Sequence, residues 1–331
     1  MRNVRALAAV IGACLSVTAI DASIDTSAAS PRLISLGFNS SLNNPQQIGA
    51  DAFKQELDKY FKGRVSIDER GSNTFGSENA LVAGLQAGAL DVTIVTGPVI
   101  GPVVPEFSVF DVPFLFRDSA HVKAVVEGPI GQAIAAKFPD KGLVLLAIGE
   151  QGFRNVTNSK HPIMTPADLK GLKIRVLPND VYKMTFQTLG ADVVPMEFPL
   201  VYAALKDGRI DGQENPYSSI LSAGFQAVQK YMTLTRHFFA PIAFVMNRET
   251  FESFSPADRQ AIIEAAKVAA EAQRVFTAKL AGQQLEALKQ GGMQVVEVVD
   301  RQPFIDAVKP LEPEFEKRFG KDLLASIRST H

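Results

Sequence analysis

The sequence lacks an excess of charge of either sign, which limits the partners that the chain can bind. Its 331 residues include 34 Lys and Arg against 35 Asp and Glu, a formal net charge of −1 at pH 7, with no run of like charge. A nucleic-acid-binding surface or a surface for anionic membranes requires a clustered excess of basic residues. We therefore expect no nucleic-acid partner. A balanced chain can still place a few arginines around a small anion.

Long hydrophobic runs are also missing, apart from one short run near the N-terminus. Basic residues precede the apolar residues 6–15, and small residues follow up to Ser30. This order is typical of a secretory signal peptide, and the run is too short to span a membrane comfortably. We expect residues 1–30, with an approximate end between Ala22 and Ser30, to be removed, and the remaining chain to be exported to the periplasm.

Cysteine is nearly absent, since Cys14 is the only one and lies inside this segment. Residues 11–14 loosely resemble a lipoprotein cleavage box, but the apolar stretch before them is short. We favour removal of Cys14 with the signal peptide over a lipid anchor. The mature chain would then have no disulfide, no thiol nucleophile and no thiolate metal site.

Signals for catalysis are weak as well. The four histidines His121, His161, His237 and His331 are far apart and share no metal-ligand spacing with carboxylates. The sequence contains no glycine-rich phosphate loop and no Gly-x-Ser-x-Gly nucleophile elbow. His237, followed by two phenylalanines, fits a packed histidine at a strand end better than a catalyst. We predict no cofactor and no metal, and we do not expect an enzyme.

The chain beyond Arg32 alternates short apolar stretches with amphipathic ones. The pattern predicts strands at residues 33–38, 65–67, 91–95, 143–148, 154–157 and 172–176, and helices that start at Pro45 and span residues 78–90. This alternation indicates an α/β fold with mainly parallel sheets. Because the cycle restarts after Glu150, we expect two lobes with a boundary near that residue.

One predicted helix is unusually long, from about Pro256 to Gly291. Residues 255–258 (SPAD) have the pattern of a helix start, and alanines enrich the middle. At about 1.5 Å per residue such a helix spans roughly 50 Å, more than one lobe of this size. We expect it to brace both lobes.

Two arginines stand out because they lie in strand patterns. Arg154 begins one predicted strand, and Arg175 lies inside another with apolar neighbours on both sides. A buried guanidinium without a partner costs several kcal/mol. Each arginine therefore either pairs with a structural Asp or Glu, reaches solvent at a sheet edge, or points into a cleft to form a two-pronged bond with a ligand carboxylate.

The polar stretch at residues 209–217 (RIDGQENPY) follows an apolar helical segment. The Asp-Gly pair predicts a turn, and Asn215 before Pro216 predicts the start of a helix. Asn215 can cap that helix and can also present its amide to an anion near the positive helix end. We expect Gln213 and Glu214 to shape the turn.

Several motifs occur together in a fixed order: GFRN at residues 152–155, TPADLKGLKIRV at 165–176, VPMEF at 194–198 and DGQENP at 211–216, with PEF at 105–107, DVPFLF at 111–116 and AVQKY at 227–231 in addition. In these motifs the sequence resembles the extracytoplasmic solute receptors of tripartite ATP-independent periplasmic (TRAP) transporters, of the dicarboxylate-receptor (DctP) type. The resemblance covers residues 32 to at least 299.

The resemblance implies a two-lobed periplasmic binding protein fold, with a ligand cleft between the lobes and a long helix that braces both. Lobe one would comprise residues 32–151 and 240–279, and lobe two residues 152–239 and 280–331. It also implies a receptor, monomeric by our expectation, that captures a small organic acid and delivers it to a TRAP-type membrane permease.

The resemblance also implies site residues. Arg175 matches the arginine that holds the ligand carboxylate, Arg154 a second basic residue, Asn215 an asparagine of the same group and Phe198 an aromatic residue that packs on the ligand. Asn39 and Glu78 are further candidate contacts in regions where the family varies; Glu78 could equally be a solvated residue at a helix start. The sequence departs from the family at Pro199-Leu200, which could alter the cleft edge.

Two other functions share these features. An exported enzyme could use Glu78 or Glu214 as a base on a similar acid, and a ligand-sensing subunit could dock on a signalling receptor instead of a permease. The ligand could be a dicarboxylate, a hydroxy acid, a sugar acid or an aromatic acid.

Overall fold

The computed structural model describes residues 30–331, with gaps at 41–43, 72–73, 75 and 298–299. The predicted signal peptide, with Cys14 and most of the predicted cleavage region, lies outside the described residues. Among the helices that are described, none is both long and apolar enough to cross a membrane.

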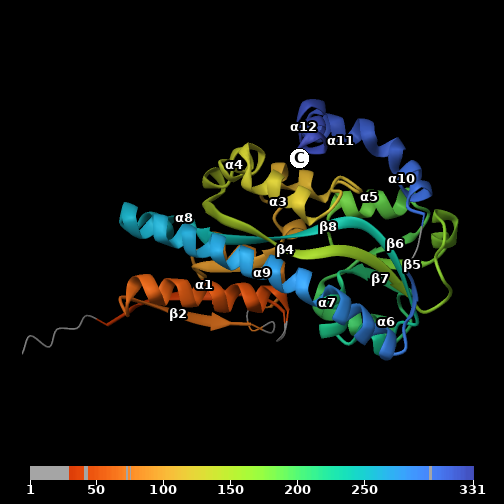
Figure 1. The fold of residues 1–331 in the computed structure, drawn as a ribbon, viewed down its shortest axis with the longest axis horizontal. Helices are drawn as coiled ribbons and strands as arrows, with labels where there is room; N and C mark the ends of the chain where they lie inside the picture. The colour runs from red at the N-terminus through yellow and green to blue at the C-terminus, as the bar shows by residue number, and fades with distance from the viewer. Residues whose placement is uncertain (1–29, 41–43, 72–73, 75, 298–299) are drawn as a thin grey trace, which may run out of the picture. The chain divides into compact units, whose positions relative to one another are not determined.

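Within the described residues the strands form one mixed sheet of nine strands, in the order β2-β1-β3-β8-β4-β7-β5-β6, with β9 beside β8 (Figure 1). The strands are β1 (Arg32–Gly37), β2 (Val65–Arg70), β3 (Val92–Thr96), β4 (Leu143–Asn158), β5 (Lys173–Val176), β6 (Asp192–Pro195), β7 (Gly212–Asn215), β8 (Tyr231–Asn247) and β9 (Gln294–Val296). Strands pair in parallel at the two ends of the sheet. At one end β1 lies between β2 and β3, and at the other end β5 lies between β6 and β7. The central pairs β3–β8, β8–β4 and β4–β7 are antiparallel. The prediction of mainly parallel sheets is therefore wrong for the centre.

Two long strands explain that centre. β4 has 16 residues and β8 has 17, and they run antiparallel to each other between the two ends of the sheet. The two strands predicted at residues 143–148 and 154–157 are one strand, because β4 continues through the expected boundary near Glu150. The pairing of β4 with β8 shifts register between Glu150 and Gly152. Gly152 has φ 109°, a left-handed conformation that favours glycine.

The helices lie between the strands and at the C-terminus. They are α1 (Pro45–Phe61), α2 (Glu78–Gln86), α3 (Ser119–Glu127), α4 (Pro129–Ala135), α5 (Asp180–Thr188), α6 (Val201–Lys206), α7 (Tyr217–Ser222), α8 (Arg248–Glu252), α9 (Pro256–Gln290), α10 (Gln302–Val308), α11 (Glu312–Phe319) and α12 (Lys321–Ser329). The helix start at Pro45 is confirmed, with the Asn44 side chain accepting from the Gln46 backbone N–H. The helix predicted at residues 78–90 already ends at Gln86.

The predicted long helix is confirmed as α9, with 35 residues and the Ser255 side chain as its N-terminal cap. Figure 1 shows it running beside α1 and on toward α7, and it also contacts β4. Gln273 of α9 is fully buried and donates to the Pro45 carbonyl oxygen at 2.8 Å. A Cβ atom at Gly49 or Gly149 would overlap the Gln273 side chain, so these glycines permit the close approach. α9 thus contacts both parts of the sheet.

Alternating residues of β8 fill separate cores on the two faces of the sheet. Ala243 and Val245 join a core with α2, α3, α11 and α12, whereas Phe244 and Met246 join a core with α1, β1 and α9. Two further cores cover the other end of the sheet, one with α5 and α10 and one with α6 and α7. The C-terminal helices α11 and α12, assigned by the resemblance to lobe two, therefore pack on a core built largely from residues of the predicted lobe one.

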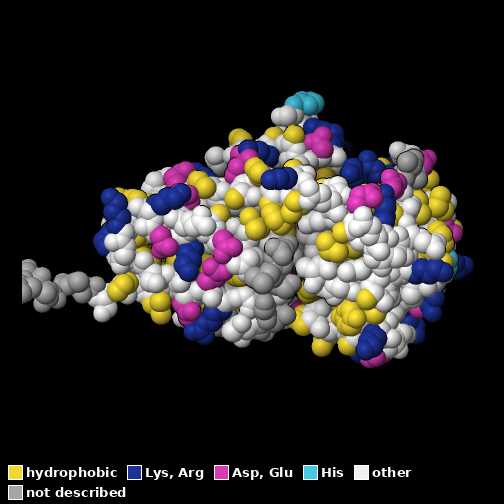
Figure 2. Space-filling model, turned by 60° about the horizontal axis from the view of Figure 1, so that its bottom comes forward, with side chains coloured by type: hydrophobic (Ala, Val, Ile, Leu, Met, Phe, Trp, Pro, Cys, Tyr) yellow, Lys and Arg dark blue, Asp and Glu magenta, His cyan; other side chains and the backbone are white. Residues whose placement is uncertain are grey.

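The surface fits the balanced composition. Figure 2 shows Lys and Arg side chains interspersed with Asp and Glu over the visible face, without a large area of one sign. On this face we see no surface suited to a polyanion.

Candidate ligand-binding site

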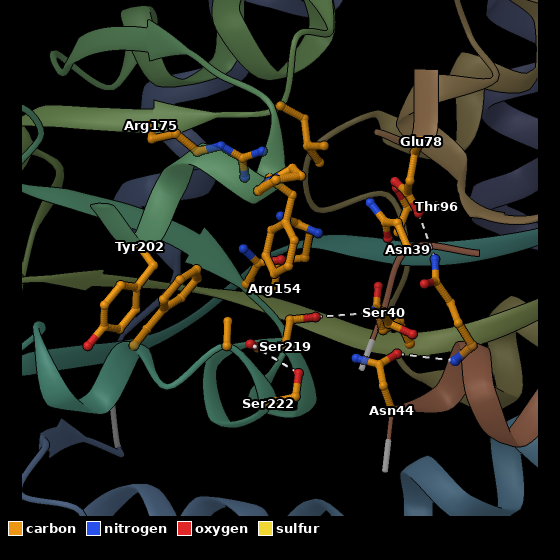
Figure 3. A pocket seen from close by; sticks show the side chains of 18 residues that line it. Asn39, Ser40, Asn44, Glu78, Thr96, Arg154, Arg175, Tyr202, Ser219 and Ser222 are labelled. Atoms are coloured by element: carbon orange, nitrogen blue, oxygen red, sulfur yellow. Dashed lines mark hydrogen bonds between the residues drawn. The ribbon is translucent and has the colours of Figure 1, made fainter. Parts of the chain in front are cut away.

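A cavity of about 240 Å³ lies where residues from the first strands and helices meet residues from β4 onward. This is far more room than one water molecule needs, about 10–15 Å³ on the same kind of measure. All six residues predicted as ligand contacts line it (Figure 3), together with twelve others: Ser40, Asn44, Gln46, Thr96, Gln151, Leu177, Pro199, Tyr202, Ser219, Ser222, Ala223 and Phe225. The structure therefore brings the six together: Arg175, Arg154, Asn215, Phe198, Asn39 and Glu78.

Arg175 carries a positive charge that no described acidic residue pairs with. Its side chain is fully buried, and Nε donates to the Met196 carbonyl oxygen at 2.8 Å. Both terminal nitrogens, Nη1 and Nη2, are buried and lack a hydrogen-bond partner in the described part of the chain. Burial lowers the pKa of Arg175 to about 10, so the guanidinium remains protonated at neutral pH. The two terminal nitrogens of a positively charged guanidinium are thus left to donate to a bound molecule.

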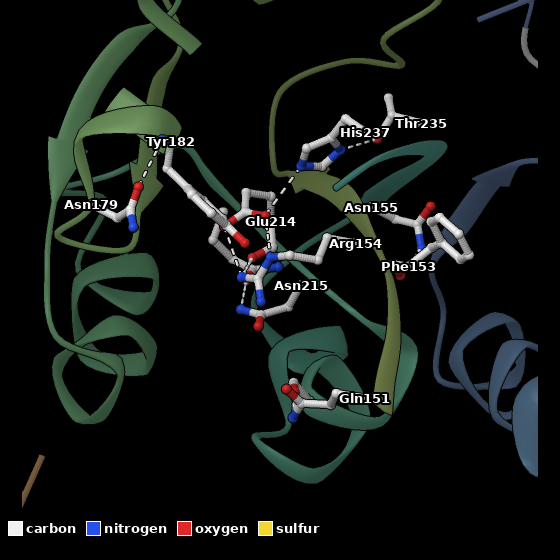
Figure 4. A network of polar contacts seen from close by, with 12 residues as sticks. Gln151, Phe153, Arg154, Asn155, Asn179, Tyr182, Glu214, Asn215, Thr235 and His237 are labelled. Carbon is white, nitrogen blue, oxygen red and sulfur yellow. Dashed lines mark hydrogen bonds and ion pairs between the residues drawn. The ribbon is translucent and has the colours of Figure 1, made fainter. Parts of the chain in front are cut away.

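Arg154 differs from Arg175, because Glu214 already pairs with it (Figure 4). Its Nε donates to Glu214 Oε2 at 2.5 Å, and Nη2 donates to Glu214 Oε1 at 2.8 Å and to the Glu214 carbonyl oxygen at 2.7 Å. Only Nη1 makes no hydrogen bond to a described residue. Of the alternatives open for the two arginines, pairing with a structural acid is correct for Arg154. The fixed charge of the cavity therefore comes mainly from Arg175.

Glu214 is the centre of a buried polar network, so its predicted role in shaping a turn is wrong. It lies in β7 and is fully buried, and His237 Nε2 is 3.1 Å from its Oε2. Burial alone would raise the pKa of Glu214, but the Arg154 charge and the hydrogen bonds from His237 and Arg154 outweigh it and lower the pKa. Burial lowers the pKa of His237. The interpretation of His237 as a packed histidine agrees with this placement.

Asn215 is the last residue of β7, and the helix that follows begins at Tyr217 with Pro216 in the cap position. Its predicted role as a helix cap is therefore wrong. Asn215 and Gln213 lie on one face of β7, two residues apart, and Arg175 lies opposite Gln213 in the parallel pairing with β5. Asn215 Nδ2 donates to Gln213 Oε1 at 2.5 Å. Residues 212–215 of the polar stretch thus form β7, an inner strand of the sheet. Its polar side chains are satisfied there because they bond to one another and to β4.

Glu78 lies on the side of the cavity opposite Arg175 (Figure 3). It is buried, so the alternative of a solvated helix-start residue is wrong. Its Oε1 accepts from Gln46 Nε2 at 2.6 Å and from the Thr96 backbone N–H at 2.9 Å, and its Oε2 accepts from Thr96 Oγ1 at 2.5 Å. Burial raises the pKa of Glu78, although these hydrogen bonds and the Arg154 charge oppose that rise.

An aromatic wall completes the cavity. Phe198 is half-buried and packs on Phe225 with ring centroids 5.8 Å apart, and Tyr202 lies beside the same cavity. Leu200, the departure from the family pattern, is 57% exposed and does not line the cavity. Pro199, the other residue of that departure, does line the cavity.

Two contacts outside the cavity lining join residues that precede β4 to residues that follow it. Asn79 of α2 donates to Glu197 Oε1 at 2.5 Å. Deeper in the molecule, Asn179 Nδ2 donates to Asp111 Oδ2 at 3.0 Å, while Asp111 Oδ1 is buried and has no partner in the described residues. Burial raises the pKa of Asp111 to about 8, although the Asn179 hydrogen bond opposes the rise.

We expect Asp111→Asn to change how stability depends on pH. The folded-state pKa lies above the ordinary value of 3.8. The protonated Asp111 side chain thus contributes fully to stability below pH 3.8, and this contribution is lost as the pH rises to about 8. Asparagine can keep the bond to Asn179 without a charge. In urea titrations the variant should exceed the natural protein in stability by more than about 1 kcal/mol at pH 8.5, with a smaller difference at pH 5. An equal difference at both values would contradict this prediction.

Sequence reasoning did not single out the other Asn, Gln, Ser and Thr residues of the cavity, such as Asn44, Gln46, Thr96, Gln151, Ser219 and Ser222. Gln46 occupies an ordinary helix position, and its role depends on Glu78, 32 residues away in sequence. No local pattern signals such a pair. Among the described residues no group of three or more His, Cys, Asp or Glu is placed to hold a metal ion.

The comparisons with known proteins agree with one another, and the matches cover nearly the whole described chain. Residues 36–318 match the family described as bacterial extracellular solute-binding protein, family 7. The sequence is 35% identical over 309 residues to the 2,3-diketo-L-gulonate-binding periplasmic protein YiaO of Escherichia coli, covering 92% of this chain and 94% of that protein.

Two solved structures are also similar. A TRAP periplasmic solute-binding protein from Bordetella, with density interpreted as pantoate, has a TM-score of 0.89 and 39% identity over 91% of this chain and 99% of that chain. A TRAP periplasmic solute-binding protein from a Polaromonas species, bound to D-erythronate, has a TM-score of 0.89 and 36% identity over 90% and 99% of the two chains.

Proposed function

Because this chain belongs to the bacterial extracellular solute-binding proteins of family 7, we propose that it uses Arg175 to capture a small hydroxylated carboxylate for delivery to a TRAP-type membrane permease. The family consists of periplasmic solute-binding proteins and not of enzymes, and the fold is its two-lobed α/β fold with α9 contacting both parts. The ligand, the contact residues and the permease are the proposal.

The observation that carries the proposal is the state of the Arg175 side chain. Nη1 and Nη2 are buried, charged and without partners in the described residues, and the residue lines the cavity. The planar guanidinium matches the two oxygens of a carboxylate and can donate to both. A buried charge of this kind is costly until an anion binds. Arg154 Nη1 and the Asn215 amide lie at the same cavity and can supplement the contact.

The alternative of an enzyme fits these contacts less well. Glu214, one candidate base, is committed to Arg154 and His237. Glu78, the other, accepts three hydrogen bonds from Gln46 and Thr96. We propose that both carboxylates organise the cavity and that the ligand leaves unchanged.

The chemical class of the ligand follows from the relatives and the lining together. Diketogulonate, pantoate and D-erythronate, bound by three relatives, each combine one carboxylate with hydroxyl groups. The cavity here combines Arg175 with serine, threonine, asparagine and glutamine side chains. We therefore propose a sugar acid or a similar hydroxy acid, with Phe198 packing on its carbon chain.

We further propose that two lobes close on this ligand, lobe one with residues 32–151 and 240–279 and lobe two with residues 152–239 and 280–331. The contacts Asn79–Glu197 and Asp111–Asn179 each join the first of these ranges to the second. Closure excludes water, which strengthens the charged hydrogen bonds at Arg175.

A thermal-shift screen tests the proposed function. Sugar acids, hydroxy acids, dicarboxylates, neutral sugars and amines are each added to the purified protein at the same concentration. A ligand at a hundred times its dissociation constant stabilises the folded protein by about 2.7 kcal/mol. We expect hydroxylated acids to raise Tm, and mass analysis after long incubation to recover them unchanged. Stabilisation by neutral sugars or amines, with none from any acid, would overturn the proposal.

A further inference from the structure

The cavity contains hydrogen-bond acceptors that no described residue bonds to, and one of them lies beside Glu78, on the side opposite Arg175 (Figure 3). Among the described residues, three cavity-lining oxygens are buried and lack partners: the amide oxygens Gln46 Oε1 and Gln151 Oε1, and the hydroxyl oxygen of Ser40, which can also donate. An amide oxygen accepts hydrogen bonds and cannot donate them. The guanidinium of Arg175, at the other side of the cavity, can only donate hydrogen bonds. The Arg175 side therefore offers donors to a ligand, and the Gln46 side offers an acceptor.

Glu78 fixes the orientation of the Gln46 amide. Glu78 Oε1 accepts both the Thr96 backbone N–H and a hydrogen bond from the Gln46 side chain. Because the backbone group can only donate, this oxygen acts as an acceptor, and the Gln46 group facing it must be the NH₂. Gln46 Oε1 is consequently directed away from Glu78. Gln151 is held less strictly, because its Nε2 contacts the Ser219 hydroxyl, which can donate or accept.

This polarity discriminates between the two ends of a ligand. A hydroxyl group near Gln46 can donate to Oε1, whereas an ionised carboxylate has no hydrogen to donate. A second carboxylate would leave Gln46 Oε1 unpaired, which is unfavourable for a buried acceptor. It would also bring a negative charge toward Glu78.

We propose that Gln46, oriented by Glu78, is a specificity-determining residue that selects acids with a hydroxyl group at the end away from Arg175 and rejects dicarboxylates of the same length. This inference rests on the proposed function, in which Arg175 binds the ligand carboxylate. It names a hydroxylated monocarboxylate as the ligand class.

Matched pairs of sugar acids test the inference by calorimetry. D-Erythronate and meso-tartrate differ only in a terminal CH₂OH or carboxylate, as do D-galactonate and galactarate. We expect the monocarboxylate of whichever pair binds to have at least tenfold higher affinity than its dicarboxylate. In Gln46→Met, which removes the acceptor at similar size, this ratio should fall toward one, mainly through weaker binding of the monocarboxylate.

A second variant and a control keep the test decisive if Gln46→Met folds poorly. Glu78→Gln removes the charge and lets the Gln46 amide turn, so the ratio should fall here too, with a gain for the dicarboxylate. Gln47→Ala is the control, because Gln47 bonds to Asp51 and Glu69 and does not line the cavity. Its ratio should match that of the natural protein.

The possible outcomes separate this inference from the proposed function. Equal or tighter binding of the dicarboxylate, an unchanged ratio in both Gln46→Met and Glu78→Gln, or binding of only unhydroxylated acids would overturn the inference while Arg175-dependent acid binding stands. If no acid binds the natural protein, or if acids bind without Arg175, the proposed function itself fails.

Discussion

Arg175→Ala is expected to weaken binding of the acid found in the screen by at least about thirtyfold while leaving the protein folded. Removing one partner of a desolvated charge pair costs about 2–5 kcal/mol, and about 1.4 kcal/mol corresponds to a tenfold change. Within the described part of the chain the side chain makes one hydrogen bond, from Nε to the Met196 carbonyl oxygen. Its unpaired charge is costly without a ligand, so Tm of the free protein should not fall steeply. Titration calorimetry and a melting curve measure both quantities.

Arg175→Lys separates charge from geometry. Lysine keeps a positive charge but cannot offer two coplanar donors to one carboxylate, so affinity should still fall. Arg209→Ala is the matched control, because Arg209 is exposed and away from the cavity and should leave affinity unchanged. Near-natural affinity in Arg175→Lys would contradict the two-pronged contact, and near-natural affinity in Arg175→Ala would contradict carboxylate binding at this residue.

The burial of Arg175 could be predicted from the sequence because its signal is local. An arginine between apolar residues in a strand must be buried, and burial demands a partner that is either inside the protein or bound to it. This reasoning leaves the partner open for both arginines, and only the resemblance to the family favours a ligand carboxylate. For Arg154, the choice required Glu214, which lies 60 residues away in sequence and reaches Arg154 only through the pairing of β4 with β7.

The misread elements share one physical cause. Local rules predict a boundary in β4 near Glu150 and a turn with a helix cap in β7, because both strands contain glycines and polar residues that are typical of turns. In the structure those polar groups are satisfied by residues distant in sequence, such as Gln213 by Thr157 of the neighbouring strand at 2.8 Å. Tertiary hydrogen bonds of this kind override local preference.

Glu214→Gln is expected to destabilise the protein by about 3–5 kcal/mol, because it leaves Arg154 as a buried charge without a counter-charge. Both side chains are almost fully buried, and three hydrogen bonds join them. For a chain of this size the loss corresponds to a fall in Tm of roughly 5–8 °C. Glutamine is nearly isosteric with glutamate, so the effect reports the charge and not a cavity. Urea titration of the natural protein and the variant gives the difference in the free energy of unfolding.

The double variant Arg154→Met/Glu214→Gln distinguishes pairing from general damage. Since neither charge is then left alone, its loss of stability should be smaller than the sum of the two single losses, with an interaction energy of about 0.5–3 kcal/mol. Additive losses would contradict a mutual role of the pair. If the double variant also binds the acid within about tenfold of the natural protein, a change of about 1.4 kcal/mol, then Arg154 serves the site by holding β4 against β7. A much larger loss of affinity would instead indicate that Nη1 of Arg154, which makes no hydrogen bond to a described residue, binds the ligand together with the two terminal nitrogens of Arg175.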